Sequence, residues 1–420
     1  MHLAALALTA LIFLVNGVLL PGSTSVDSPY IANQVAFAFE LSGDDMEQEP
    51  AQWIDTWFFH APPPANARLL GKVPIYLSYR LANYCGLTPL DAFYLSYLAW
   101  TAAFVYAFLL FGARCVATIA GRIEMLSGPA HRRLELPSMV ILALLPPVLF
   151  AFKFPVHGSP NEFLGYALIA ACMNTLLEEH LARFCVFALL GVPCRETNLL
   201  TLLPMLVLGS GDGLRRGLIA LAVVLASLAF RLTLGGHYAP TAGAEHNWIF
   251  PAETLAFAYL VFGPLWMPAA LSAAEILRNP PNREARLYAL CALVSVLLVV
   301  AAVMLFARMR EIRITYTLWI YVVPLALAAI DSFMRRATRA QHFILGCCMA
   351  LGAALTLGLY MLLLPRGPAD FTHKAGALLH FYSGFGGGWS WHFLIYALPA
   401  IPLLAIGLFL PWLPAVRAHS

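Results

Sequence analysis

The sequence predicts an all-α, polytopic integral membrane protein, and its composition is the main reason. Hydrophobic residues make up 61% of the 420 positions and only 11% are charged, against about 25% in a soluble domain. A soluble enzyme of this length would need more surface charge, and a disordered chain would be poorer in apolar residues. The net charge of +3 and the absence of long basic runs argue against nucleic-acid binding.

Twelve apolar runs approach the roughly 20 residues that a spanning helix needs. They cover about 3–20, 89–112, 137–152, 162–178, 182–193, 198–210, 217–230, 252–276, 287–307, 314–330, 342–364 and 391–414. The fifth and sixth runs are short enough to be half-helices, so we expect 10–12 transmembrane helices in one domain over 1–420. The first run has only His2 as an n-region and no A-x-A site, which favours a retained helix over a signal peptide.

Basic residues in short loops predict the orientation, because such residues stay on the cytoplasmic side. With both termini in the cytoplasm, 14 of the 25 basic residues and 8 of the 22 acidic residues lie inside. The inside set is Arg114, Arg122, Arg132, Arg133, Arg183, Arg215, Arg216, Arg278, Arg283, Arg286, Arg335, Arg336, Arg339 and Arg417. Glu178, Glu179, His180 and Asp331 fall at inner boundaries and are interpreted as caps or loop residues.

Two outer segments are long in this topology. The first extracytoplasmic loop covers 21–88 and contains two amphipathic stretches, 28–41 and 68–84, which we expect on the membrane surface. The second extracytoplasmic loop covers 231–251 and is rich in Gly, His and Pro. These loops are where an extracytoplasmic site would form.

Several charged residues lie on the outer side against the orientation trend. They are Arg195, Glu196, Arg231, His237, Arg310 and Arg313. A lipid phosphate is the natural anionic partner at this depth, and arginine presents a fixed fork of donors to it. The alternatives are a local Arg195–Glu196 ion pair that closes a helical hairpin, interfacial snorkelling of the later arginines, and a solvated loop histidine.

Asp27 is the candidate catalytic carboxylate, since it lies just beyond the first helix. A carboxylate there can act as a general base toward a hydroxyl. The sequence Asp27-Ser28-Pro29 also fits a helix N-cap. The eight cysteines form no C-x-x-C pair, and no acidic or histidine cluster has metal-ligand spacing, so neither a metal nor another cofactor is expected.

A first helix is followed by a long outer loop that opens with an acidic residue, and four short segments accompany this layout. These are Ala67-Arg68-Leu69-Leu70-Gly71-Lys72-Val73-Pro74, Gly86-Leu87-Thr88-Pro89 ahead of an aromatic-rich second helix, Cys194-Arg195-Glu196-Thr197-Asn198-Leu199-Leu200, and Arg310-Glu311-Ile312-Arg313 ahead of Val322-Val323-Pro324. Together they resemble bacterial members of the GT-C superfamily of membrane glycosyltransferases. The resemblance covers most of 1–330 in layout.

This resemblance implies a reaction and its partners. A sugar would pass from a polyprenyl-phosphate donor to a hydroxyl of a glycan, lipid or protein acceptor, at the outer face of the bacterial cytoplasmic membrane. Asp27 matches the acidic residue of the first loop, and the arginines and His237 would stabilise the leaving phosphate. Many family members carry paired acids there, so Glu40, Asp44 and Asp55 also remain candidates for the base. A soluble C-terminal domain found in some relatives is not evident.

Three other functions remain open from the sequence. An O-antigen-type polymerase or ligase also uses lipid-linked donors, but typically places its large loop late in the chain. A lipid or solute transporter would place ionisable groups and broken helices near the midplane. A scaffold within an envelope complex is the third alternative.

Overall fold

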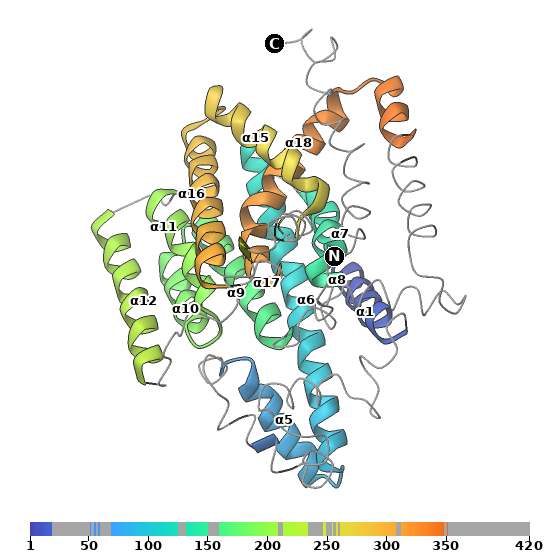
Figure 1. Ribbon diagram of the computed structural model, residues 1–420, viewed down its shortest axis with the longest axis vertical. Coiled ribbons are helices and arrows are strands. Elements are labelled where there is room, and N and C mark those ends of the chain that lie inside the picture. The colour runs from blue at the N-terminus through green and yellow to red at the C-terminus, as the bar shows by residue number, and fades with distance from the viewer. Residues whose placement is uncertain are drawn as a thin grey trace. The chain divides into compact units, whose positions relative to one another are not determined.

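The computed structural model describes residues 1–18, 69–124, 132–149, 159–208, 213–233, 261–307 and 312–347, and isolated positions between and after them (Figure 1). These residues form helices joined by turns, with no strand among them, which confirms the all-α class. Among these described residues, four helical stretches are long and apolar enough to cross a membrane, and they indicate a membrane protein. They are Pro89–Ile123, Gly213–Thr233, Arg283–Phe306 and Tyr316–Arg336. The total of 10–12 helices remains a prediction.

The chain divides into two compact units, and the first contains most of the N-terminal half. It comprises Met1–Cys115, Glu135–Leu144 and Val148–Thr241. Its described helices are α1 (His2–Val18), α5 (Lys72–Tyr84), most of α6 (Pro89–Ile123), α7 (Glu135–Leu144), α9 (Ser159–Leu177), α10 (Leu181–Gly191), η3 (Glu196–Thr201), α11 (Leu202–Leu208) and α12 (Gly213–Thr233). Helix α1 packs on α7, and α10 packs on α9, η3 and α12.

A tight turn at Glu179 folds α9 and α10 into a hairpin. Glu179 has a φ of 62°. Its N–H donates to the carbonyl of Leu176 at 3.0 Å, while the His180 N–H donates to the carbonyl of Thr175 at 2.8 Å. This pair of bonds is the Schellman C-cap, which usually has glycine in the left-handed position. The interpretation of this segment as a cap is confirmed.

The chain between α10 and α12 is broken into short helices. Helix α10 has 11 residues, about 16 Å of helix, against a hydrocarbon layer of about 30 Å. After it, Arg195 is extended, and η3 and α11 contribute 6 and 7 residues. The described parts of the fifth and sixth runs therefore form short helices, and their interpretation as half-helices stays a prediction.

The second unit comprises Val116–Leu134, Leu145–Pro147 and Ala242–Ser420. Its described helices after the end of α6 are η4 (Gly263–Leu265), α15 (Trp266–Arg278), α16 (Arg283–Phe306), α17 (Ile312–Thr315), η5 (Tyr316–Leu318) and α18 (Trp319–Arg336). The short α8 (Pro146–Leu149) crosses from this unit into the first. Helix α15 packs along α18 and against α16.

A proline inside α18 is accommodated by a neighbouring helix. Pro324 has no N–H, so the carbonyl of Ile320, four residues earlier, loses its helical partner. The hydroxyl of Tyr288 on α16 donates to that carbonyl. Buried backbone acceptors in a membrane protein need such substitutes.

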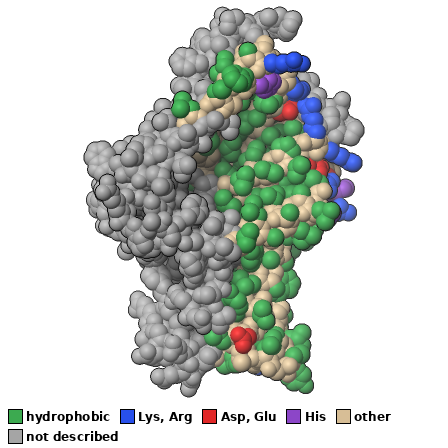
Figure 2. Space-filling view, turned by 90° about the vertical axis from the view of Figure 1, so that its right-hand side faces the viewer, with side chains coloured by type: hydrophobic (Ala, Val, Ile, Leu, Met, Phe, Trp, Pro, Cys, Tyr) green, Lys and Arg blue, Asp and Glu red, His purple; other side chains and the backbone are tan. Residues whose placement is uncertain are grey.

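The exposed side chains are largely apolar, as a lipid-facing surface requires. Figure 2 shows hydrophobic side chains over most of the described part of one face. On α12, Leu218, Leu221, Leu225 and Leu228 are all more than half exposed and recur every three or four residues. Such a stripe in water would be an aggregation hazard, whereas in a bilayer it faces acyl chains.

The ion pairs agree with the predicted sorting of helix ends by side. The pairs Arg114–Glu178 at 2.7 Å, Arg122–Glu284 at 3.4 Å and Arg133–Asp331 at 2.8 Å each join residues assigned to the cytoplasmic side. Two further pairs, described below, join residues assigned to the outer side. Which side is cytoplasmic remains a prediction.

Candidate functional site

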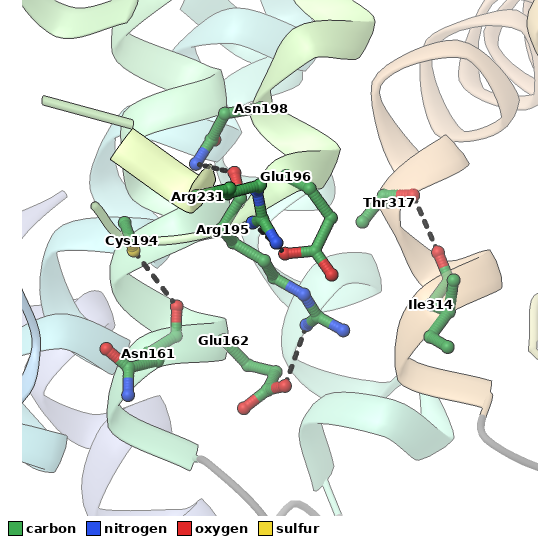
Figure 3. A network of polar contacts seen from close by, with 9 residues as sticks. All are labelled: Asn161, Glu162, Cys194, Arg195, Glu196, Asn198, Arg231, Ile314 and Thr317. Atoms are coloured by element: carbon green, nitrogen blue, oxygen red, sulfur yellow. Dashed lines mark hydrogen bonds and ion pairs between the residues drawn. The ribbon is translucent and has the colours of Figure 1, made fainter. Parts of the chain in front are cut away.

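A buried ion pair lies at the centre of the candidate site in the first unit. Glu162, in the first turn of α9, contacts Arg195 at 2.8 Å between Oε1 and Nη1 (Figure 3). The Arg195 side chain is 2% exposed and that of Glu162 is 7% exposed. Two charges this far from solvent depend on each other, since neither can be hydrated.

A second ion pair extends the site to α12. Arg231, in the last turn of α12, contacts Glu196 at 2.7 Å through Nη2 and Oε2. This pair is only partly buried, with Arg231 14% and Glu196 29% exposed. The hypothesis of a local Arg195–Glu196 pair is therefore wrong as stated: the two neighbours pair with different helices. Together the two pairs join α9, the α10–η3 junction and α12.

Buried amides hold the junction in shape. The Asn198 side chain donates from Nδ2 to the carbonyls of Gly191 and Arg195, both at 3.1 Å. Gly191 is required by this contact, because a Cβ there would lie 2.8 Å from Cβ of Asn198. The Cys194 thiol donates to the carbonyl of Asn161 at 3.3 Å. The bonds restrain the chain on both sides of Arg195.

The end of the first outer loop is attached to the same junction. The Leu70 N–H donates to the carbonyl of Pro193 at 3.1 Å, and the Gly71 N–H donates to Oδ1 of Asn161 at 3.1 Å. A Cβ on Gly71 would lie 2.3 Å from that Oδ1, so any other residue would have to displace the Asn161 side chain and disturb this bond. The start of α5 thus lies beside the α10–η3 junction.

The electrostatics of the two arginines differ. Burial works against the charge on Arg195, but Glu162 and then Tyr166 and Glu196 outweigh it, and the pKa of the guanidinium is raised above its ordinary value. Arg195 is therefore a permanent, enclosed cation. Its Nε has no hydrogen-bond partner among the described residues. Arg231 is the more accessible cation, because its pair is partly exposed.

The structure brings together only some of the predicted site residues. Arg195, Glu196 and Arg231 meet within the first unit. Asp27, His237 and Arg310 lie outside the described residues, as do Glu40 and Asp44. For Arg313 only the backbone is described, within α17 of the second unit.

Asp55, one alternative for the base, has local partners in the first outer loop. It accepts a hydrogen bond from the Tyr76 hydroxyl at 2.7 Å and lies 4.0 Å from Arg80. Burial and then Asp55 raise the pKa of Tyr76. These contacts anchor 54–55 to α5.

Glu162 is the residue that the sequence interpretation missed. The sequence contained a signal for it: Glu162 and Arg195 lie at similar numbers of residues before and after the turn at Glu179 and His180. In antiparallel helices that spacing places two residues at the same level. The sequence pattern is a carboxylate at the start of one apolar run and an arginine just after the end of the following run.

The described residues contain no group of three or more His, Cys, Asp or Glu that could hold a metal ion. Comparison of the chain with protein-family models, with curated proteins and with solved structures finds no match.

Proposed function

We propose that the protein is a membrane glycosyltransferase that moves a sugar from a polyprenyl-phosphate donor to an acceptor hydroxyl at the extracytoplasmic face. The observation that carries the proposal is the convergence of two arginines and two carboxylates where the outer loop meets the α10–η3 junction. Cations at that position suit a lipid phosphate, whose charge grows as the sugar leaves.

The proposed roles follow from exposure. Arg231 would contact the phosphate, because its side chain is 14% exposed, against 2% for that of Arg195. Arg195 is too enclosed to touch a substrate and would act as a positioning residue, held by Glu162 to keep the junction rigid. In the reaction, Asp27 accepts the proton of the acceptor hydroxyl as its oxygen attacks the anomeric carbon. The bond from that carbon to the phosphate oxygen then breaks, and polyprenyl phosphate leaves.

A binding experiment tests the phosphate site without knowledge of the sugar. Polyprenyl phosphate, common to all such donors, is added to the purified protein in nanodiscs, with polyprenol as the control lipid lacking phosphate. We expect the phosphate lipid to raise the melting temperature of the wild type more than polyprenol does, and Arg231→Gln to abolish that difference. Arg114→Gln, which breaks an ion pair at the other end of the helices, should leave it intact. Equal stabilisation by both lipids would contradict the proposal.

The proposed role of Asp27 as the general base is tested by a transfer assay. Asp27→Asn should lower transfer from a polyprenyl-phosphate sugar in membranes by about 10²–10⁴-fold, the usual contribution of a general base. Asp55→Asn is the matched control and should retain transfer, since the Asp55 carboxylate already accepts a hydrogen bond from the Tyr76 hydroxyl. Full activity of Asp27→Asn at normal protein levels would exclude Asp27 as the base.

A transporter is the second candidate, and one observation favours it. The broken helices around a buried Glu162–Arg195 pair are features that transporters use near their substrates. The two functions separate in one assay in proteoliposomes. A transferase forms a new glycosidic product from the donor, whereas a transporter moves the donor across the bilayer unchanged.

A further inference from the structure

Helix α5 has an unusual distribution of side chains for a helix in an extracytoplasmic loop. Its exposed face is formed by Val73, Leu77, Arg80, Leu81 and Tyr84, with a single charge among them. The spacing of four, three, one and three residues keeps all five within one stripe of the helix. On a helix in water this is the face that should be polar.

The opposite face of α5 is already covered by protein. Ile75 and Tyr79 are buried in a cluster with Ala92, Phe93 and Tyr97 of α6. The Tyr79 and Phe93 rings meet edge to face, with centroids 6.1 Å apart. Neither face of α5 is therefore a water-facing polar surface, so it is not an ordinary surface amphipathic helix.

The neighbouring helix locates α5 relative to a bilayer. Helix α6 has 35 residues, about 52 Å, and exceeds the roughly 30 Å of hydrocarbon by about 20 Å. Arg114 is the first basic residue of α6 and is assigned to the cytoplasmic side. A span of about 20 residues that ends there begins near Tyr94, which therefore marks the outer edge of the hydrocarbon layer. The α5 contacts on α6 lie at this level, and Figure 1 shows α5 beside the start of α6.

The polar contacts of this region fit a membrane boundary. Trp100 donates from Nε1 to the Ser78 hydroxyl at 2.7 Å. Tyr94 and Trp100 are partly exposed and are of the aromatic types found where acyl chains meet headgroups, whereas Tyr97 is buried in the cluster with α5. Arg80 lies 58% exposed within the apolar stripe, as a snorkelling side chain does.

We propose that the exposed face of α5 is a lipid-binding surface, seated at the boundary between the headgroups and the acyl chains of the bilayer. Val73, Leu77, Leu81 and Tyr84 contact acyl chains, and Arg80 reaches a lipid phosphate. Because Leu70 and Gly71 at the start of α5 are bonded to the junction beside Arg195, the bilayer surface and the candidate site are held at one level. The inference does not depend on the proposed reaction.

A fluorescence experiment on the full chain tests the placement. An environment-sensitive fluorescent amino acid is introduced singly at Leu77 or Leu81, and the protein is reconstituted into vesicles of phosphatidylcholine and phosphatidylglycerol. Leu228, exposed on the candidate span α12, is the lipid-facing reference, and Arg132, an exposed residue outside the candidate spans, is the water-facing reference. All four positions are exposed, so folding should be preserved.

We expect the probes at Leu77 and Leu81 to emit at shorter wavelength than the Arg132 probe and to be quenched by brominated lipid as strongly as the Leu228 probe. Quenching by aqueous iodide, as at Arg132, would overturn the proposal. Resistance to both quenchers would also overturn it, because the face would then be covered by protein.

Discussion

The two clusters of charge in this protein pair their carboxylates differently. In the first unit each carboxylate pairs with its own arginine: Glu162 pairs with Arg195, and Glu196 pairs with Arg231. In the second unit Glu124 and Asp331 share Arg335, and Arg133 contacts Asp331. One-to-one pairing stabilises both charges, whereas sharing leaves one carboxyl short of positive charge.

The consequence appears in the pKa of Glu124. Burial first, and then a hydrogen bond and charge repulsion from Asp331, raise the pKa of Glu124 to about 7, while Arg335 and Arg133 oppose the shift. The first cluster should therefore be sensitive to loss of a partner, and the second to pH. The predictions below test that difference.

The largest effect is expected from Glu162→Gln, which leaves Arg195 buried without a counter-charge. Such a loss costs about 3–5 kcal/mol in the free energy of unfolding, measured by chemical denaturation in detergent. The control is Glu178→Gln, whose partner Arg114 is 61% exposed, and it should cost less than about 1 kcal/mol. The double variant Glu162→Leu with Arg195→Met should recover most of the loss, because no charge remains buried. Similar costs for Glu162→Gln and Glu178→Gln would show that burial does not separate the two pairs.

The second prediction concerns pH. Folded Glu124 holds its proton up to a pH of about 7, while an ordinary glutamate loses it near 4.5. Between these values the folded state binds more protons than the unfolded state, so stability falls as pH rises through this window. Melting temperatures from pH 4.5 to 7.5 check this, and Glu124→Gln should flatten the curve. Glu284→Gln, a 62% exposed acid in the same unit, should leave the slope unchanged.

The third prediction removes the hydroxyl that replaces a missing backbone donor. Tyr288→Phe leaves the Ile320 carbonyl without a partner and should cost about 1–3 kcal/mol in unfolding free energy. In a Pro324→Ala background the backbone N–H returns, so the same change should cost clearly less. An undiminished cost in that background would show that Tyr288 acts through packing instead.

The smallest effect is a gain in stability. Glu179 occupies a left-handed conformation that costs a residue other than glycine about 1–2 kcal/mol. Glu179→Gly should raise the unfolding free energy by about 0.5–1 kcal/mol, since glycine also gains freedom in the unfolded chain. Asn279→Gly is the control at another helix end, because Asn279 has a φ of −131° and nothing to relieve. A gain at both positions would point to a general effect of glycine.

The location of the helices followed from the sequence to a large extent. Apart from α5, which lies in the predicted first outer loop, the described helices lie mainly on the apolar runs, including the two short ones after α9, because burial in lipid demands continuous apolar stretches. The grouping of helix ends by predicted side also agrees with the ion pairs. The amphipathic pattern of 68–84 predicted a helix on the membrane surface, but only the tertiary structure showed that α5 buries one face on α6.

The choice of partners was decided by the tertiary structure alone. Arg195 and Glu196 are neighbours in the chain and favoured a local pair, yet the extended backbone at Arg195 directs them to different helices. Composition shows that charged residues are scarce, and their order in the sequence places them at the ends of the apolar runs. Which charges meet, and how deeply they are buried, depends on side-chain direction and helix packing, and these emerge only when segments far apart in the chain come together.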